Sequence, residues 1–165
     1  MTYILAEQRD QDDLKAAAQC WAAYQAFLQD NQQHFPPGAY ALATSDWFYN
    51  FRDPRCPHDA WLEWARFEEP SEGERSEIRT TSLRVRLLGA YHDLWLELYY
   101  PRVYAYTCEV TPADHGHGDW RYDEFRLSER GHLLHEIEWA DGGRWLIEAS
   151  DLQFSWLPRE RTSVT

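Results

Sequence analysis

The stretch Ser82-Leu83-Arg84-Val85-Arg86-Leu87 decides how this sequence folds. Its leucine and valine residues alternate with serine and arginine, and this period of two is typical of a β-strand with one face against a hydrophobic core. After a short turn at 89–93, the alternation is repeated by Leu94, Leu96 and Leu98. Two successive strands joined by a short turn pair antiparallel. The middle of the chain is therefore predicted to form an antiparallel sheet.

The same period continues on both sides of this hairpin. The turns at 128–131 and 141–143 contain glycine and are typical of hairpins. Pro101 bends or interrupts the chain between two strands. The last strand is expected to bulge near Ser150, because the apolar residues before and after this position fall out of phase. The predicted strands are 60–68, 82–87, 94–99, 103–110, 120–127, 132–139 and 144–156.

The residues before the sheet are predicted to be helical. Apolar residues recur at intervals of three and four along 12–33, and Pro37 suits the first turn of a second helix at 37–44. We therefore predict an α+β fold in which two N-terminal helices pack on a curled antiparallel β meander of six or seven strands. One domain is expected to span residues 1–165, with a helical part at 12–51, the meander at 58–157 and a frayed tail at 159–165.

The composition is acidic, with 16 Lys and Arg residues against 28 Asp and Glu residues and a net charge of −12. Proteins bind nucleic acids largely by neutralising phosphates with cationic side chains, so this charge argues against DNA, RNA and anionic membranes as direct ligands. It favours association with a basic protein partner. The alternative left open is that the charge only keeps the protein in solution.

The three cysteines are widely spaced and form no Cys-x-x-Cys pair, which argues against a disulfide framework or a zinc knuckle. Free thiols fit a reducing compartment. Residues 1–7 lack the basic and apolar regions of a signal peptide, and no apolar run approaches the ~18 residues that a membrane span needs. A cytoplasmic location is expected, and no cofactor is predicted.

Histidines and aspartates form the first candidate site. His58 and Asp59 precede the first strand, His92 lies in a turn, and His115 and His117 share one Gly-rich loop. Imidazole and carboxylate groups are the usual ligands of a hydrolytic metal, so these residues suggest a metal-dependent hydrolase as one alternative. The competing interpretation is structural, with the His58–Asp59 pair satisfying polar groups where the connector meets the sheet.

Aromatic and acidic side chains on the sheet form the second candidate site. Trp95, Glu97 and Tyr99 lie opposite the leucine row of their strand, and Glu136 and Glu138 share one face of a later strand. Exposed aromatic patches often mark binding surfaces, and an acidic-aromatic face suits a basic protein or a cationic ligand. Two alternatives stay open: the rings fill a nearly closed barrel, or the curled sheet encloses a small-ligand pocket.

The sheet opens with His58-Asp59-Ala60-Trp61-Leu62, continues through the strand at 83–87 and ends at 152–156. On these features, residues 58–157 resemble small bacterial α+β domains of uncharacterised function, some of whose relatives are thought to be immunity partners of secreted toxins. The resemblance implies a bacterial cytosolic origin and an inhibitor role, and it supplies no functional residues.

The sequence contains neither a Gly-rich phosphate loop nor a Gly-x-Ser-x-Gly elbow. We therefore predict a non-enzymatic acidic binding domain that recognises a basic protein partner, in the role of a toxin-neutralising immunity protein that the resemblance implies. The predicted contacts are Trp95, Glu97 and Tyr99, with Glu136 and Glu138 as a second patch. The metal-dependent hydrolase and the small-ligand-binding curled sheet are the alternatives.

Overall fold

A computed structural model describes residues 2–5, 14–110 and 116–159 of the chain. These residues form two helices and ten strands. In chain order the elements are α1 (Leu14–Asp30), α2 (Pro37–Ala43), β1 (Trp61–Glu68), β2 (Ser71–Glu72), β3 (Ile78–Arg79), β4 (Ser82–Leu88), β5 (Leu94–Tyr100), β6 (Val103–Cys108), β7 (Trp120–Leu127), β8 (Leu133–Trp139), β9 (Arg144–Ala149) and β10 (Gln153–Pro158).

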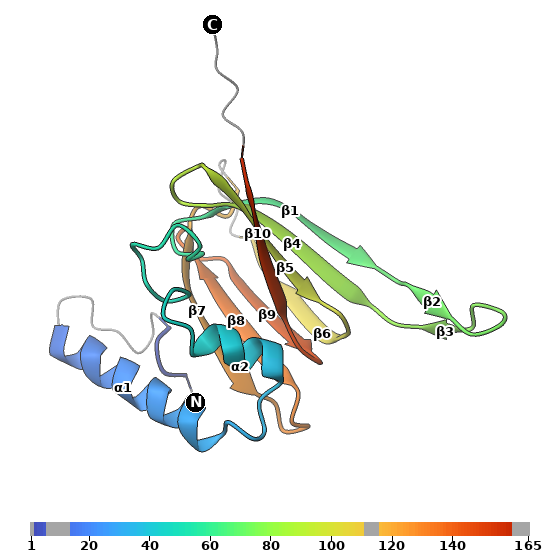
Figure 1. The fold of residues 1–165 in the computed structure, drawn as a ribbon, viewed down its shortest axis with the longest axis horizontal. Helices are drawn as coiled ribbons and strands as arrows, with labels where there is room; N and C mark the ends of the chain where they lie inside the picture. The colour runs from blue at the N-terminus through green and yellow to red at the C-terminus, as the bar shows by residue number, and fades with distance from the viewer. Residues whose placement is uncertain (1, 6–13, 111–115, 160–165) are drawn as a thin grey trace, which may run out of the picture.

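Two four-stranded antiparallel sheets make up the body of the molecule (Figure 1). Sheet 1 has the strand order β1-β4-β5-β10, and sheet 2 has the order β6-β9-β8-β7. Strands β2 and β3 form a separate short hairpin that extends β1 and β4 away from the body. Helix α2 lies beside β10 and β7, where the two sheets approach each other, and α1 lies outside β7.

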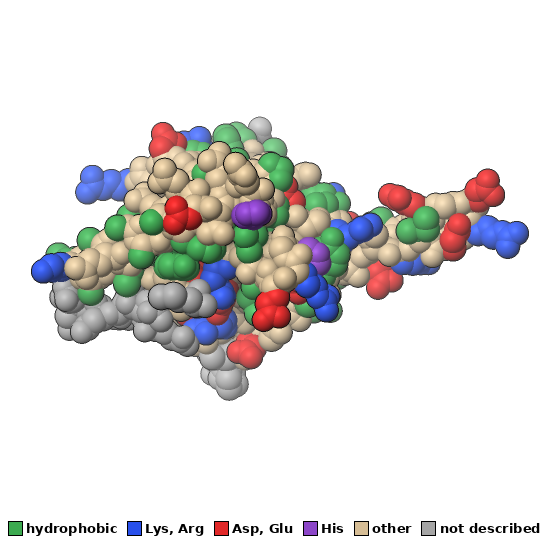
Figure 2. Space-filling view, turned by 90° about the horizontal axis from the view of Figure 1, so that it is seen from below, with side chains coloured by type: hydrophobic (Ala, Val, Ile, Leu, Met, Phe, Trp, Pro, Cys, Tyr) green, Lys and Arg blue, Asp and Glu red, His purple; other side chains and the backbone are tan. Residues whose placement is uncertain are grey.

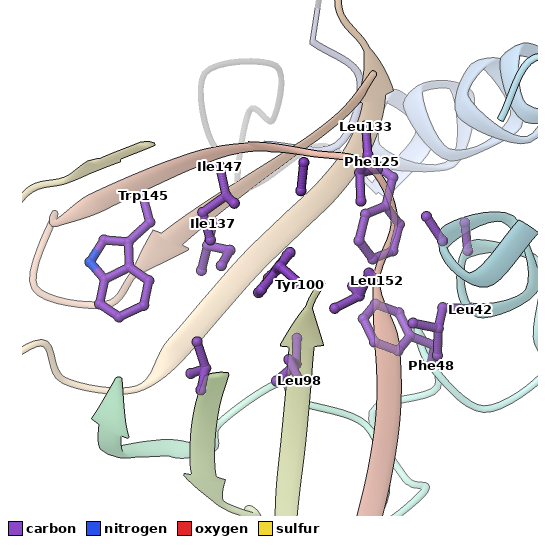
Figure 3. Packing of buried hydrophobic residues seen from close by; sticks show 14 of the residues in the cluster. Leu42, Phe48, Leu98, Tyr100, Phe125, Leu133, Ile137, Trp145, Ile147 and Leu152 are labelled. Atoms are coloured by element: carbon purple, nitrogen blue, oxygen red, sulfur yellow. The ribbon is translucent and has the colours of Figure 1, made fainter. Parts of the chain in front are cut away.

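The hydrophobic core lies between the two sheets. In Figure 3, Leu98 and Tyr100 of sheet 1 share one space with Ile137 and Ile147 of sheet 2, while Phe48 closes the end near α2. The strand period explains this packing. In β4, for example, Leu83, Val85 and Leu87 face the core and the two arginines face the other side of the sheet.

The predicted α+β fold with a single curled meander is wrong, because the strands divide between two layers and the described structure is mostly β. The chain leaves sheet 1 after β5 at Pro101, which has no amide hydrogen for a ladder, and it enters sheet 2 at Val103. It returns to sheet 1 through residues 150–152, so the predicted strand 144–156 is two strands in different sheets. The phase change near Ser150 marks a crossing between layers.

Most predicted elements are confirmed, although their pairing is not sequential. Both helices form, with α1 ending at Asp30, and the start predicted at 12–13 lies outside the described residues. The strands predicted at 60–68, 82–87, 94–99, 103–110, 120–127 and 132–139 end within two residues of the observed ones. Between the first two predicted strands, the structure has an additional short hairpin formed by β2 and β3. The tail at 160–165 also lies outside the described residues.

Helix α1 closes the free edge of sheet 2. Strand β7 is an edge strand, and edge strands carry unpaired backbone groups. The buried hydroxyl of Tyr24 in α1 accepts a hydrogen bond from the Phe125 amide at 2.8 Å and donates one to the Phe125 carbonyl at 3.1 Å. One side chain thus satisfies both backbone groups of an edge residue.

The crossing between β9 and β10 also holds α2. The N-cap position of α2 is Pro36, whose side chain cannot cap, and the Asp151 carboxylate accepts the amides of Gly38 and Ala39 at 3.0 and 2.9 Å. The approach is close, since a Cβ placed on Gly38 would lie 2.2 Å from the Leu152 carbonyl oxygen. Asp151 therefore lies in the crossing between the two sheets and also caps helix α2.

We expect Asp151→Ala to lower the free energy of unfolding by about 1–2 kcal/mol, because two helix amides lose their acceptor. Asp151→Asn should cost less, since its amide oxygen still accepts. Asp30→Ala, at the exposed end of α1, is the matched control and should change stability by less than about 0.5 kcal/mol. Urea denaturation measures all three, and equal costs for the two alanine variants would contradict the capping role.

Candidate functional site

The predicted binding face around Trp95, Glu97 and Tyr99 lies on the outer side of sheet 1. All three side chains are partly exposed, and the core side of the same strand is buried. Glu97 accepts a hydrogen bond from Arg86 at 2.8 Å, and the Arg84 guanidinium lies 4.0 Å from the centre of the Tyr99 ring. The face is therefore lined by arginine and aromatic groups, and its one predicted acidic side chain is already paired.

Glu136 and Glu138 do share one face of β8, as predicted, but they are buried at 6% and 7% exposure. They belong to a row of alternating charges on the outer side of sheet 2. Arg126 lies between Glu124 and Glu136, and Arg144 contacts both Glu136 at 3.3 Å and Glu138 at 2.7 Å. Consequently these two glutamates act in ion pairs within the fold and offer no open acidic patch.

The described histidines of the metal hypothesis pack against different aromatic residues. His58 stacks on Phe51 with the two ring centres 3.8 Å apart, whereas the ring centre of His92 lies 4.6 Å from that of Trp61. His117 lies against Trp139 at 4.9 Å, and His115 is outside the described residues. In the described ranges, no three His, Cys, Asp or Glu side chains are grouped so that they could hold a metal ion.

Asp59 anchors the strand start mainly through its backbone. It adopts a left-handed conformation with φ 63°, and its amide donates to the Trp120 carbonyl at 2.9 Å. Its carboxylate is 55% exposed and lies 3.2 Å from His58 Nδ1. Among the described residues, this carboxylate is not seen to accept a backbone amide. The connector is instead joined to the sheet by the hydrogen bond from the Asp59 amide to the Trp120 carbonyl.

The structure shows a pocket that sequence reasoning did not find. It has a volume of about 250 Å³ and lies at the edge of sheet 2, between β7, α1 and the connector at 44–60. Seven of its lining residues carry aromatic rings, if the imidazole of His58 is included, and one carries a buried carboxylate. The lining residues are Ile4, Trp21, Phe48, Tyr49, Phe51, Cys56, His58, Trp120, Arg121, Tyr122 and Asp123.

The carboxylate in this pocket is Asp123, which is 4% exposed. Its Oδ1 accepts a hydrogen bond from the indole N–H of Trp120 at 3.0 Å. Its Oδ2 lies 3.1 Å from His135 Nε2, and Nδ1 of the same ring lies 2.7 Å from the Tyr100 hydroxyl. His135 and Tyr100 are fully buried. The three side chains thus form a hydrogen-bonded row from the pocket wall into the core.

The chemistry of Tyr100 sets the direction of these hydrogen bonds. Burial raises the pKa of the Tyr100 phenol well above its usual value, with the charge of Asp123 as a further cause. The hydroxyl therefore keeps its proton, which it donates to Nδ1 in the His135 tautomer that carries its own proton on Nε2. In that tautomer both oxygens of Asp123 accept hydrogen bonds, one from Trp120 and one from His135.

Two other titratable groups of the pocket lining, Tyr49 and Cys56, are neutral. Burial raises the pKa of the Tyr49 phenol, again with Asp123 as a contributing charge. Burial also raises the pKa of the Cys56 thiol to about 12, with Asp123 among the contributing charges, so at neutral pH this cysteine is a protonated thiol and a poor nucleophile. Asp123 is therefore the dominant charge inside the pocket.

A β-bulge builds the wall of this site. The pairing of β7 with β8 shifts between Trp120 and Tyr122, which puts Trp120 and Asp123 on the same side of the strand although they are three residues apart. Bulges often re-aim side chains beside functional sites. In the sequence, a sign of this site was the run Trp120-Arg121-Tyr122-Asp123, which places a carboxylate among large aromatic residues of a strand. A second signal was His135, which shares its strand face with Leu133 and Ile137.

No protein-family model, curated protein or solved structure matches this chain. Among the described residues, no helix is both long and apolar enough to cross a membrane.

We expect the Glu124 carboxyl to make stability depend on pH. Burial raises its pKa, against the opposing effects of the Ile4 and Tyr3 amides and Arg126. The folded state then binds this proton more tightly than the unfolded state, so the contribution of Glu124 falls as pH rises above about 4.5. In Glu124→Gln, Oε can still accept both amides. Between pH 4 and about 6.5, wild type should lose stability relative to this variant.

Glu148→Gln provides a control of opposite sign. The hydrogen bond from His132 lowers the pKa of Glu148, so its contribution is lost as pH falls. Between about pH 3 and pH 5, wild type should gain stability relative to Glu148→Gln as pH rises, because the contribution is complete above the unfolded-state pKa. Chemical denaturation at several pH values measures both differences, and parallel curves for wild type and Glu124→Gln would show that burial of Glu124 does not shift its proton affinity.

Proposed function

We propose that this protein is a non-enzymatic binding domain whose pocket takes a compact organic cation, an ammonium or quaternary ammonium group, in front of Asp123. The observation that carries the proposal is the bonding of Asp123. Its hydrogen-bond donors are the indole of Trp120 and the imidazole of His135, and no Lys or Arg of the described residues forms an ion pair with it. A buried carboxylate without a permanently charged partner is costly, and a cationic ligand supplies that partner.

The pocket lining supports a cation over a neutral ligand. The faces of Trp and Tyr rings attract cations, and desolvated contacts of this kind are worth about 2 kcal/mol or more. Trp21, Tyr49, Trp120 and Tyr122 are all in the wall. A volume of about 250 Å³ lies below the ~300–1,000 Å³ typical of drug-sized ligands, so the ligand group contains few heavy atoms.

Arg121 is the one cationic residue of the lining. It is exposed, and its guanidinium lies 5.5 Å from the Tyr122 ring centre. At this position solvent and salt screen its charge, whereas the Asp123 carboxylate is buried and is screened less. The net charge of −12 further favours the approach of cations.

Two sources offer this chemistry: a free quaternary ammonium compound, and a lysine or methylated lysine side chain of a basic protein. The second source agrees with the basic protein partner expected from the sequence. The immunity role implied by the resemblance stays a prediction.

We expect choline chloride to bind to the pocket with a dissociation constant below about 10 mM, at least tenfold tighter than its neutral carbon analogue 3,3-dimethylbutan-1-ol. The readout is the ¹⁵N–¹H resonance of the Trp120 indole, which donates to Asp123. Sodium chloride at the same ionic strength controls for salt. If choline leaves this resonance unchanged at 20 mM, or if the two compounds bind equally, the proposal is overturned.

Four variants sharpen this test. Asp123→Asn should lower the affinity for choline at least about tenfold and leave the affinity for the neutral alcohol unchanged. Asp46→Asn, at an exposed site, should change neither affinity. Phe51→Ala removes a half-exposed wall ring and should weaken choline about three- to tenfold. Arg121→Gln should raise the affinity for choline about twofold at low salt.

A short peptide with trimethyllysine distinguishes the two sources of the cation. If this peptide binds more tightly than choline, the cation belongs to a protein, and if choline binds more tightly, it belongs to a small molecule.

A further inference from the structure

The hairpin extension of sheet 1, here called the arm (residues 69–79), projects from the body of the molecule (Figures 1 and 2). Every residue of the arm is exposed, including Ile78 at 52%. A two-stranded hairpin on its own is at best marginally stable in water. The arm also carries four glutamates and two arginines, so it is acidic.

The outer face of sheet 1 at the base of the arm has the opposite character. Arg66 lies 4.2 Å from the centre of the Trp64 ring, and Arg86 lies 5.1 Å from the same ring. Arg84 stacks on Tyr99 and lies 3.6 Å from Glu68. Among the described residues, Arg66 has no carboxylate within ion-pair distance. Arg86 is also paired, with Glu97. In this arginine face, formed by Arg66, Arg84 and Arg86 around Trp64 and Tyr99, Arg66 therefore carries the charge that is open to a further carboxylate.

The arm keeps the register of the strands that it extends. Trp64 pairs with Arg86 and Arg66 with Arg84, and the same register continues to the pair of Glu72 with Ile78. Since side chains alternate between the two sides of a strand, residues separated by an even number share one side. Glu72 and Ile78 thus face the same way as the arginine face, with Glu68 between them.

We propose that a second copy of this chain docks on this surface, with the arm of each copy lying across the arginine face of the other. A two-fold axis near Glu68 places the Glu72–Ile78 pair of one copy over the Trp64–Arg86 pair of its partner. Glu72 then lies over Trp64 and the Arg66 guanidinium stacked on it, and Ile78 lies over the aliphatic part of Arg86. Such an interface is self-complementary, as a two-fold dimer requires.

The size of the contact sets the strength to expect. From Trp64 to Glu72 the ladder covers eight residue steps, which is about 27 Å at ~3.4 Å per residue. An interface of two such ladders is smaller than the ~1,200–2,000 Å² of a standard stable complex. The dimer should therefore be weak, with a micromolar dissociation constant, and it should dissociate as salt screens the charges.

The test is sedimentation equilibrium of the full chain at concentrations up to about 200 µM, in 50 mM and 500 mM sodium chloride. Wild type is expected to dimerise at low salt and to be monomeric at high salt. The arm variant Glu72→Arg/Glu74→Arg and the face variant Arg66→Glu/Arg84→Glu should each be monomeric at both salt concentrations. All four positions are exposed, so circular dichroism should show an unchanged fold.

The decisive sample is an equimolar mixture of the two variants. In the mixed dimer one contact joins the reversed arm to the reversed face, and the other contact is unchanged, so dimerisation should return. Glu129→Arg, in the exposed turn after β7, is the control and should dimerise like wild type. A monomeric wild type at low salt, dimers of either charge-reversed variant, or a mixture that stays monomeric each overturn the proposal. A monomeric wild type that binds poly-glutamate would assign the arginine face to a foreign acidic segment.

Discussion

The hydrogen-bonded row Asp123–His135–Tyr100 ties the two sheets together. Tyr100 ends β5 in sheet 1, whereas His135 and Asp123 lie on β8 and β7 of sheet 2. Each of these polar groups is buried, and a buried donor or acceptor left without a partner costs about 1–3 kcal/mol. The row is satisfied only in one relative placement of the layers. It therefore specifies how the sheets meet, which nonpolar packing alone does less strictly.

The pocket depends on the same strand from its other side. Asp123 faces the interior, and the next residue, Glu124, faces outward and accepts the amides of Tyr3 and Ile4, each at 2.8 Å. Ile4 then lines the pocket beside Asp123. Two adjacent carboxylates on one edge strand thus hold the core network and the N-terminal segment that lines the pocket. Loss of the Glu124 contacts would open the pocket even if Asp123 were intact.

The sequence predicted local structure well and layer assignment poorly. The alternation in β4 and β5 follows from one face being buried, and that constraint acts within a few residues. Assignment to a sheet depends on contacts between distant segments, as when β6 pairs with β9 and β10 returns to β5. Pro101 and Ser150 marked the two crossings, but both also fit a bend within one sheet. Trp95, Glu97 and Tyr99 were correctly placed opposite the leucine row, while the arginines across from them belong to the neighbouring strand.

The distribution of charge limits what net charge can say about partners. A net charge of −12 governs long-range attraction, and it predicts the sign of a ligand only where the local surface agrees. At Asp123 the two agree, because the carboxylate is the dominant charge in an aromatic pocket. On the outer face of sheet 1 they disagree, since guanidinium groups stacked on Trp64 and Tyr99 present cations on an acidic protein. The same aromatic residues that suggested a basic partner are covered by arginine. The sign of the local charge is set by cross-strand neighbours, so it differs between the Asp123 pocket and the outer face of sheet 1.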